Sequence, residues 1–325
     1  QKILAQKKVF MYNKIMKKIS VLILLALLIS INSPLQSQAG IFNTYKLKAE
    51  QNREYKSNYE AVKKVIDSQT VYTNKYDLKG LATLYSDNFV NSDGFNKDIY
   101  FKLIDETWKT YPDITYTTEI KNIDFNENYA TVFVHETAVA TATDTVGEVQ
   151  VIGELYSTAK CVYFLEKTGS KWVISSEKIV EETSSLRYGD ARYIKMELNS
   201  PKQIGPNKYY TTTLKVDAPS DSVVIASISK ENIVYPQTKA DDAFRKLPDD
   251  NILERVFLSN KNNVNEYTVA SVGITKAEPY NENEVKVYMG GLAFIMTRVN
   301  VIPENKYIKI EPENTDEVKD SGKGK

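Results

Sequence analysis

The sequence predicts an α+β fold, in which helices are followed by an antiparallel sheet and then by a second, β-rich part. Three observations support this prediction. Residues 50–110 repeat apolar side chains at three- and four-residue steps, residues 114–181 form four β-rich runs joined by turns, and further short strands follow residue 184. Of the 325 residues, 42% are hydrophobic and 22 are tyrosines, which is typical of a packed, strand-rich protein.

The first part of the fold is expected to contain three helices. Along residues 50–76, Tyr59, Val62 and Ile66 recur on one face of a long helix. The string at residues 77–80 interrupts this helix and starts a short second one, which a brief strand at residues 89–90 follows. Asn96 is the expected N-cap of the third helix.

Four strands should form the sheet that follows these helices. Residues 114–125 and 129–142 make one hairpin, and residues 149–166 and 171–181 make a second. Cys161 shares a strand face with Tyr163 and is the only cysteine of the chain, so no intramolecular disulfide can form. We interpret it as a buried thiol that packs as a small apolar group.

The pattern resets after residue 184, and the turn residues near Pro201 and Pro206 mark a domain boundary. We expect a linker and first β-strand at residues 186–208, a β-sandwich-like domain at residues 209–310 and a disordered tail at residues 311–325. Residues 241–258 are predicted to form one or two short helices. Gly290 and Gly291 indicate a bulge or tight bend.

Residues 11–39 resemble an export signal, with a lysine-rich start, a short apolar run and small residues before a cleavage site near Ala39-Gly40. Residues 1–39 are therefore expected to be a signal peptide with an upstream extension, and residues 40–49 a linker. The apolar run is about half the length of a membrane-spanning helix, so no permanent span is expected. The protein should be exported, to the periplasm or beyond.

Removal of residues 1–39 would leave 36 basic and 42 acidic residues, a net charge of −6. A mildly acidic protein lacks the basic surface that binds phosphate backbones, which argues against nucleic acid as a partner. The single histidine and single cysteine exclude the common multi-histidine and multi-cysteine zinc sites, so we expect no metal and no cofactor.

Residues 50–185 resemble the NTF2-like superfamily, which includes SnoaL-like cyclases and ketosteroid isomerases. The resemblance is carried by the acidic-Leu turn and short helix of residues 76–90, by the hairpin at residues 126–132 and by the strand opening at residues 169–174. It implies three helices on a curved sheet, closed into a cone that often holds an apolar pocket. It implies no particular reaction. The C-terminal part resembles no family that we can name.

Two residues are weak candidates for catalysis. The resemblance to ketosteroid isomerases places Asp93 at the position of their catalytic base, but residues 91–94 also form a typical turn string, which is the interpretation we favour. His135 lies in a predicted strand, and its neighbour Glu136 points to the opposite face and cannot orient it. No complete catalytic set is therefore predicted.

Three residues on apolar helix faces are expected to contact a ligand: Gln69, Tyr72 and Trp108. Tyr72 and Trp108 would otherwise be ordinary core aromatics, and Gln69 needs a hydrogen-bond partner on its apolar face. We therefore expect an exported, non-catalytic protein that binds a small apolar molecule or a protein partner. The alternatives are an isomerase-like enzyme that uses Asp93 as general base, and a structural envelope subunit that forms a homodimer.

Overall fold

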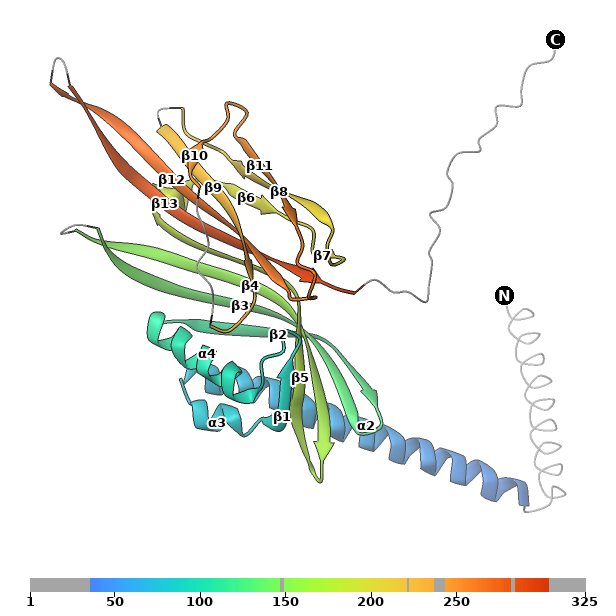
Figure 1. Cartoon of the computed structure of the whole chain (residues 1–325). Helices are drawn as coiled ribbons and strands as arrows, with labels where there is room; N and C mark the ends of the chain where they lie inside the picture. Colours follow the sequence, from blue (N-terminus) through green and yellow to red (C-terminus); the bar gives the residue numbers. More distant parts are fainter. Residues whose placement is uncertain (1–35, 147–148, 221, 237–242, 282–283, 304–325) are drawn as a thin grey trace, which may run out of the picture. The chain divides into compact units, whose positions relative to one another are not determined.

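The computed structural model describes residues 36–146, 149–220, 222–236, 243–281 and 284–303 (Figure 1). It divides the chain into two units, Gln1–Glu60 and Ala61–Lys325, and the division falls inside helix α2 (Gln36–Asn74). The expected tail and residues 1–35 of the expected signal peptide lie outside the described residues. Within the described part of the chain, no helix combines the length and the apolar character needed to cross a membrane.

The second unit begins with the last turns of α2, followed by α3 (Leu78–Ala82) and α4 (Lys97–Thr110). Val62 and Ile66 are fully buried, as the helical spacing predicts. The predicted N-cap of α4 is confirmed, because the backbone N–H of Ile99 donates to the side chain of Asn96 at 3.0 Å.

A curved antiparallel sheet lies against these helices (Figure 1). Its strands follow the order β5-β4-β3-β2, and β1 pairs with β5 in parallel. The predicted hairpins are confirmed, with Glu127 and Gly169 at positive φ in the two turns. We call residues 61–189 the cone. The strand bounds are β1 (Tyr85–Asn91), β2 (Thr115–Asn126), β3 (Tyr129–Val146), β4 (Val149–Thr168) and β5 (Lys171–Gly189).

The cone sheet continues into the second part of the chain. Strand β13 pairs with residues 183–189 of β5, and β12, β9 and β10 follow. Strand β7 also pairs with β13, so that the described residues of this sheet form ten strands. A separate three-stranded sheet has the order β11-β8-β6. The remaining elements are η1 (Asp190–Tyr193), β6 (Met196–Asn199), β7 (Gln203–Ile204), β8 (Tyr209–Val216), β9 (Ser222–Asn232), β10 (Arg245–Lys246), β11 (Ile252–Leu258), β12 (Glu266–Asn281) and β13 (Glu284–Val301).

The two sheets of the second part enclose a hydrophobic core. Leu214 and Val216 from the small sheet pack with Ala270, Val272 and Ile274 from the large one, and all five are fully buried. This arrangement is sandwich-like, but its larger layer is an extension of the cone sheet. The domain limit near residue 185 stays a prediction, because β5 runs through it to residue 189.

Two details of the second part differ from expectation. The predicted helices at residues 241–258 are wrong over the described residues from 243 on, which form β10 and β11. Leu253 and Phe257 alternate with exposed residues and bury against the core, so the two-residue period applies there. The two strands expected at residues 285–289 and 294–302 are one strand, and the predicted bulge is confirmed at Gly290.

Candidate functional site

Strands β3 and β4 supply one wall of the candidate site on the helix-facing side of the sheet. On β3, Val132 and Val134 are buried there, and Glu136 continues the same alternation. On β4, Cys161 and Tyr163 share this face, as predicted, and both are buried. The carboxylate of Glu136 therefore points into the cone.

A bulge in β5 brings a second carboxylate to the same place. Ile174 pairs with Leu165 and Ser176 pairs with Phe164, so Ser175 is an extra residue in the ladder. Strict alternation from the buried Ile174 would turn Glu177 outward. The bulge reverses the alternation, and Glu177 lies inside the cone with 4% of its surface exposed.

Of these side chains, Glu136 and Tyr163 border a small cavity of about 90 Å³ between the helices and the sheet. Apolar carbon makes up the larger part of its wall, as expected, but hydroxyl, amide and carboxyl groups also line it, so the pocket is not free of reactive groups. Sequence position alone could not show that four tyrosines and a glutamate meet there. The lining residues are Gln69, Thr70, Thr73, Leu81, Tyr85, Tyr100, Ile104, Tyr116, Thr118, Glu136 and Tyr163.

A hydrogen-bond network joins the helix side of the cavity to the sheet side. The amide Nε2 of Gln69 donates to the hydroxyl oxygens of Tyr85 at 3.1 Å and Tyr163 at 2.8 Å. The Tyr163 hydroxyl donates in turn to Oε1 of Glu136 at 2.9 Å. The Oε1 atom of Gln69 is buried and has no hydrogen-bond partner. Exchanging the amide oxygen and nitrogen would still leave one end of the amide unpaired.

Burial controls the ionisation of the two glutamates. Loss of solvation and, secondly, the charge of Glu136 raise the pKa of Glu177 to about 8. Loss of solvation also raises the pKa of Glu136, although hydrogen bonds from Tyr163 and Cys161 lower it in part. The nearby phenol of Tyr100 lowers the pKa of Glu177 in part. The single hydroxyl proton of Tyr163 is directed to Glu136.

Of the three predicted ligand contacts, only Gln69 lines the cavity. Tyr72 lies beside Gly80, where a Cβ atom would meet its ring. Trp108 is buried with its ring edge-on to Tyr76, at 5.2 Å between centroids. Both aromatics therefore belong to the packing around the cavity and not to its wall.

Asp93 does not reach the cavity either. Its carboxylate pairs with the guanidinium of Arg298 and accepts a hydrogen bond from Asn265 Nδ2 at 2.7 Å. Arg298 also lies 3.8 Å from Glu182 and is fully buried, so the pair joins the loop after β1 to strand β13. Asp93 is engaged by this buried guanidinium and does not line the cavity, which argues against it as the general base of the isomerase-like alternative.

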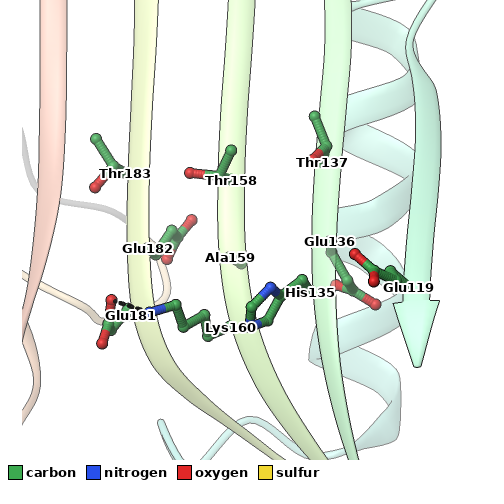
Figure 2. A pocket seen from close by; sticks show the side chains of 10 residues that line it. All are labelled: Glu119, His135, Glu136, Thr137, Thr158, Ala159, Lys160, Glu181, Glu182 and Thr183. Carbon is green, nitrogen blue, oxygen red and sulfur yellow. Dashed lines mark ion pairs between the residues drawn. The ribbon is translucent and has the colours of Figure 1, made fainter. Parts of the chain in front are cut away.

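His135 lies on the opposite, open face of the sheet, in a groove of about 270 Å³ (Figure 2). Its neighbours Lys160 and Glu181 form an ion pair of 3.0 Å there, and Lys202 approaches Glu181 to 2.8 Å. This groove is larger than the cavity and is also lined by Glu136 and Glu182, but Lys160 and Glu181 neutralise each other there, and such a half-exposed ion pair contributes little. The network inside the cone is therefore the stronger candidate site.

The sequence contained one signal for the residues that were missed. Glu136 follows Val132 and Val134 on the inward face of β3, and a charged residue that continues an apolar face needs an explanation. Glu177 had no such signal, since its inward orientation depends on the bulge at Ser175.

The cone is similar to several solved structures. A candidate scytalone dehydratase from Novosphingobium aromaticivorans is 17% identical with a TM-score of 0.33, and the match covers 39% of this chain and 86% of that one. A hexachlorocyclohexane dehydrochlorinase (LinA, type 2) is 11% identical with a TM-score of 0.33, covering 39% of this chain and 87% of that one. A candidate dehydratase of the NTF2-like family from Streptomyces avermitilis is 11% identical with a TM-score of 0.29, covering 38% and 98%.

No protein-family model matches the sequence, and no curated protein matches it either. The structural matches confirm the predicted NTF2-like resemblance for about 39% of the chain. At these identities and TM-scores the likeness concerns the fold alone. It says nothing about a ligand or a reaction of this protein.

Proposed function

We propose that the cone binds one small, uncharged molecule that carries a hydroxyl, carbonyl or amide group, and that the protein acts as an exported binding protein. The unpaired amide end of Gln69, buried in the wall of the cavity, is the observation that carries this proposal. A buried polar atom without a partner is unfavourable by about 1–3 kcal/mol, and a ligand hydroxyl or N–H could relieve it.

The size and polarity of the cavity limit the ligand. At about 10–15 Å³ for each water position, 90 Å³ holds roughly six to nine waters, or a molecule of similar size. An apolar molecule would strip water from the phenols and from Glu136 without replacing their hydrogen bonds. The carboxylate of Glu136 disfavours an anion. The expected small apolar ligand is therefore replaced in this proposal by a small polar one.

Saturation-transfer NMR on the purified protein tests the proposal directly. Acetamide and 2-propanol, which can donate a hydrogen bond to the amide oxygen of Gln69, serve as polar probes, and cyclopentane serves as the apolar control. We expect the polar probes to bind and the Q69L variant to lose at least 10-fold in affinity, because leucine keeps the volume of the side chain and removes its amide. The Q150L variant, altered at an exposed glutamine, is the matched control. Preferential binding of cyclopentane, or equal binding by Q69L, would refute the proposal.

A second candidate function is proton transfer on the bound molecule. The observation that favours it is the 2.9 Å contact between the Glu136 carboxylate and the Tyr163 hydroxyl at the cavity wall. This pair replaces Asp93 in the enzymatic alternative. Incubation of acetone in D₂O with the protein should then increase deuterium exchange at its methyl groups, and the E136Q variant should abolish the increase. Exchange at the uncatalysed rate would leave binding as the only function.

A further inference from the structure

Three possible metal ligands converge at the sheet side of the cone. Glu136, Cys161 and Glu177 come from the adjacent strands β3, β4 and β5, and one ligand atom from each lies within 4.8 Å of the other two. Cys161 and Glu177 are buried, whereas Glu136 is half-buried and also lines the cavity. The cluster is therefore closed on the sheet side and borders the cavity on the other.

An unpaired oxygen points to a missing partner in this cluster. The Oε2 atom of Glu177 is buried and has no hydrogen-bond partner. Among the described residues, neither Glu136 nor Glu177 forms an ion pair with a lysine or an arginine. The buried Arg298 is already engaged by Asp93 and Glu182. Two carboxylates and a thiol in one buried place require either protons or a cation.

The hydrogen bonds of Glu136 leave one of its oxygens for the cluster. Its Oε1 accepts from Tyr163 at 2.9 Å, whereas its Oε2 lies 3.8 Å from Sγ of Cys161. A tetrahedral zinc ion, with Zn–S of about 2.3 Å and Zn–O of about 2.0 Å, separates its sulfur and oxygen ligands by about 3.5 Å. Tyr163 occupies the place of an outer partner that orients a ligating carboxylate.

We propose that Glu136, Cys161 and Glu177 form a binding site for one Zn²⁺ ion, with the fourth position open to the cavity. Thiolate together with carboxylate suits a borderline metal such as zinc, whereas Mg²⁺ and Ca²⁺ take oxygen ligands only. Three protein ligands and one open position are the arrangement of zinc sites that hold a water or a substrate. The expectation of no metal considered only clusters of several histidines or cysteines. It did not consider two glutamates and one cysteine that come from three different strands.

Cobalt titration of the EDTA-treated full-length protein tests the site. We expect one equivalent of Co²⁺ to bind with a thiolate-to-cobalt charge-transfer absorption in the near ultraviolet, and Zn²⁺ to displace it. Because the chain has a single cysteine, this absorption can come only from Cys161. The C161S variant should lose the absorption. The E177Q variant should keep it and bind Co²⁺ at least 10-fold more weakly.

The E127Q variant, altered at an exposed glutamate in the turn between β2 and β3, is the matched control and should bind Co²⁺ as the wild type does. Circular dichroism establishes that each variant is folded, and E177Q still tests the site if C161S fails to fold. Less than one equivalent bound by the wild type, absence of the charge-transfer absorption, or equal affinity in E177Q would overturn the proposal.

The zinc proposal does not depend on the proposed ligand. Cys161 is absent from the cavity wall, so C161S should bind acetamide like the wild type in EDTA. If the wild-type protein binds acetamide but not the metal, the zinc proposal alone is overturned. If it binds the metal but not acetamide, the ligand proposal alone is overturned.

Discussion

The buried carboxyl of Glu177 gives a quantitative prediction about stability and pH. Its side chain is 4% exposed, and its pKa is about 8 in the folded protein against 4.5 for an unperturbed glutamate. Between these values the folded protein retains a proton that the unfolded chain releases. Stability should therefore be fully present below about pH 4.5 and should fall as the pH rises to about 8.

The magnitude follows from the linkage relation. One titrating group changes the free energy of unfolding by about 1.4 kcal/mol per pH unit inside this window, so Glu177 should remove about 3 kcal/mol between pH 5 and pH 7. The E177Q variant keeps a neutral side chain of the same shape and does not titrate. Its stability relative to the wild type should therefore increase by that amount over the same range.

Urea unfolding followed by tryptophan fluorescence, at pH 5, 6, 7 and 8 in EDTA, measures this difference. Glu136 and Glu182 also have raised pKa values because of burial, and their contribution should remain in both proteins. The E127Q variant should follow the wild type at every pH. Parallel stability profiles for E177Q and the wild type would show that Glu177 does not hold a proton in the folded protein, and the reasoning would fail.

Three further predictions concern other sites. Replacement of Arg298 by Met should lower the free energy of unfolding, measured in urea, by about 3–5 kcal/mol, because it leaves the buried charges of Asp93 and Glu182 uncompensated. A decrease of less than 1 kcal/mol would show that Arg298 does not compensate these carboxylates. Replacement of Asn96 by Ala should lower the free energy of unfolding by about 0.5–2 kcal/mol through loss of the α4 cap, and an unchanged midpoint would argue against the cap. The H135Q variant should unfold within about 0.5 kcal/mol of the wild type and bind acetamide equally well, since His135 lies on the open face; weaker binding would place it in the site.

Local signals predicted most of the secondary structure. The cap at Asn96 and the turns at residues 126–128 and 168–170 depend on neighbours in sequence, and each is found where expected. The prediction failed at residues 241–258, where short apolar runs suit either a helix or a strand and the pairing with β8 decides the outcome.

The candidate site was predicted only in part. Gln69 was expected to face a pocket because a polar side chain on an apolar helix face needs a partner, and it does line the cavity. Asp93 was placed by a one-residue match to a family pattern, and a distant strand supplies the arginine that engages it. That contact joins residues 205 positions apart, and no local pattern indicates it.

By itself, the sequence determined the order of helices and strands, the positions of the turns and the strand face of Cys161, since these depend on local periodicity and on turn chemistry. Only the tertiary structure decided that polar groups line part of the cavity of the cone. Two carboxylates and a thiol converge beside that cavity because strands β3 to β5 pair as neighbours and the extra residue at Ser175 turns Glu177 inward. Pairing register and bulges are properties of neighbouring strands, and one strand's sequence does not specify them.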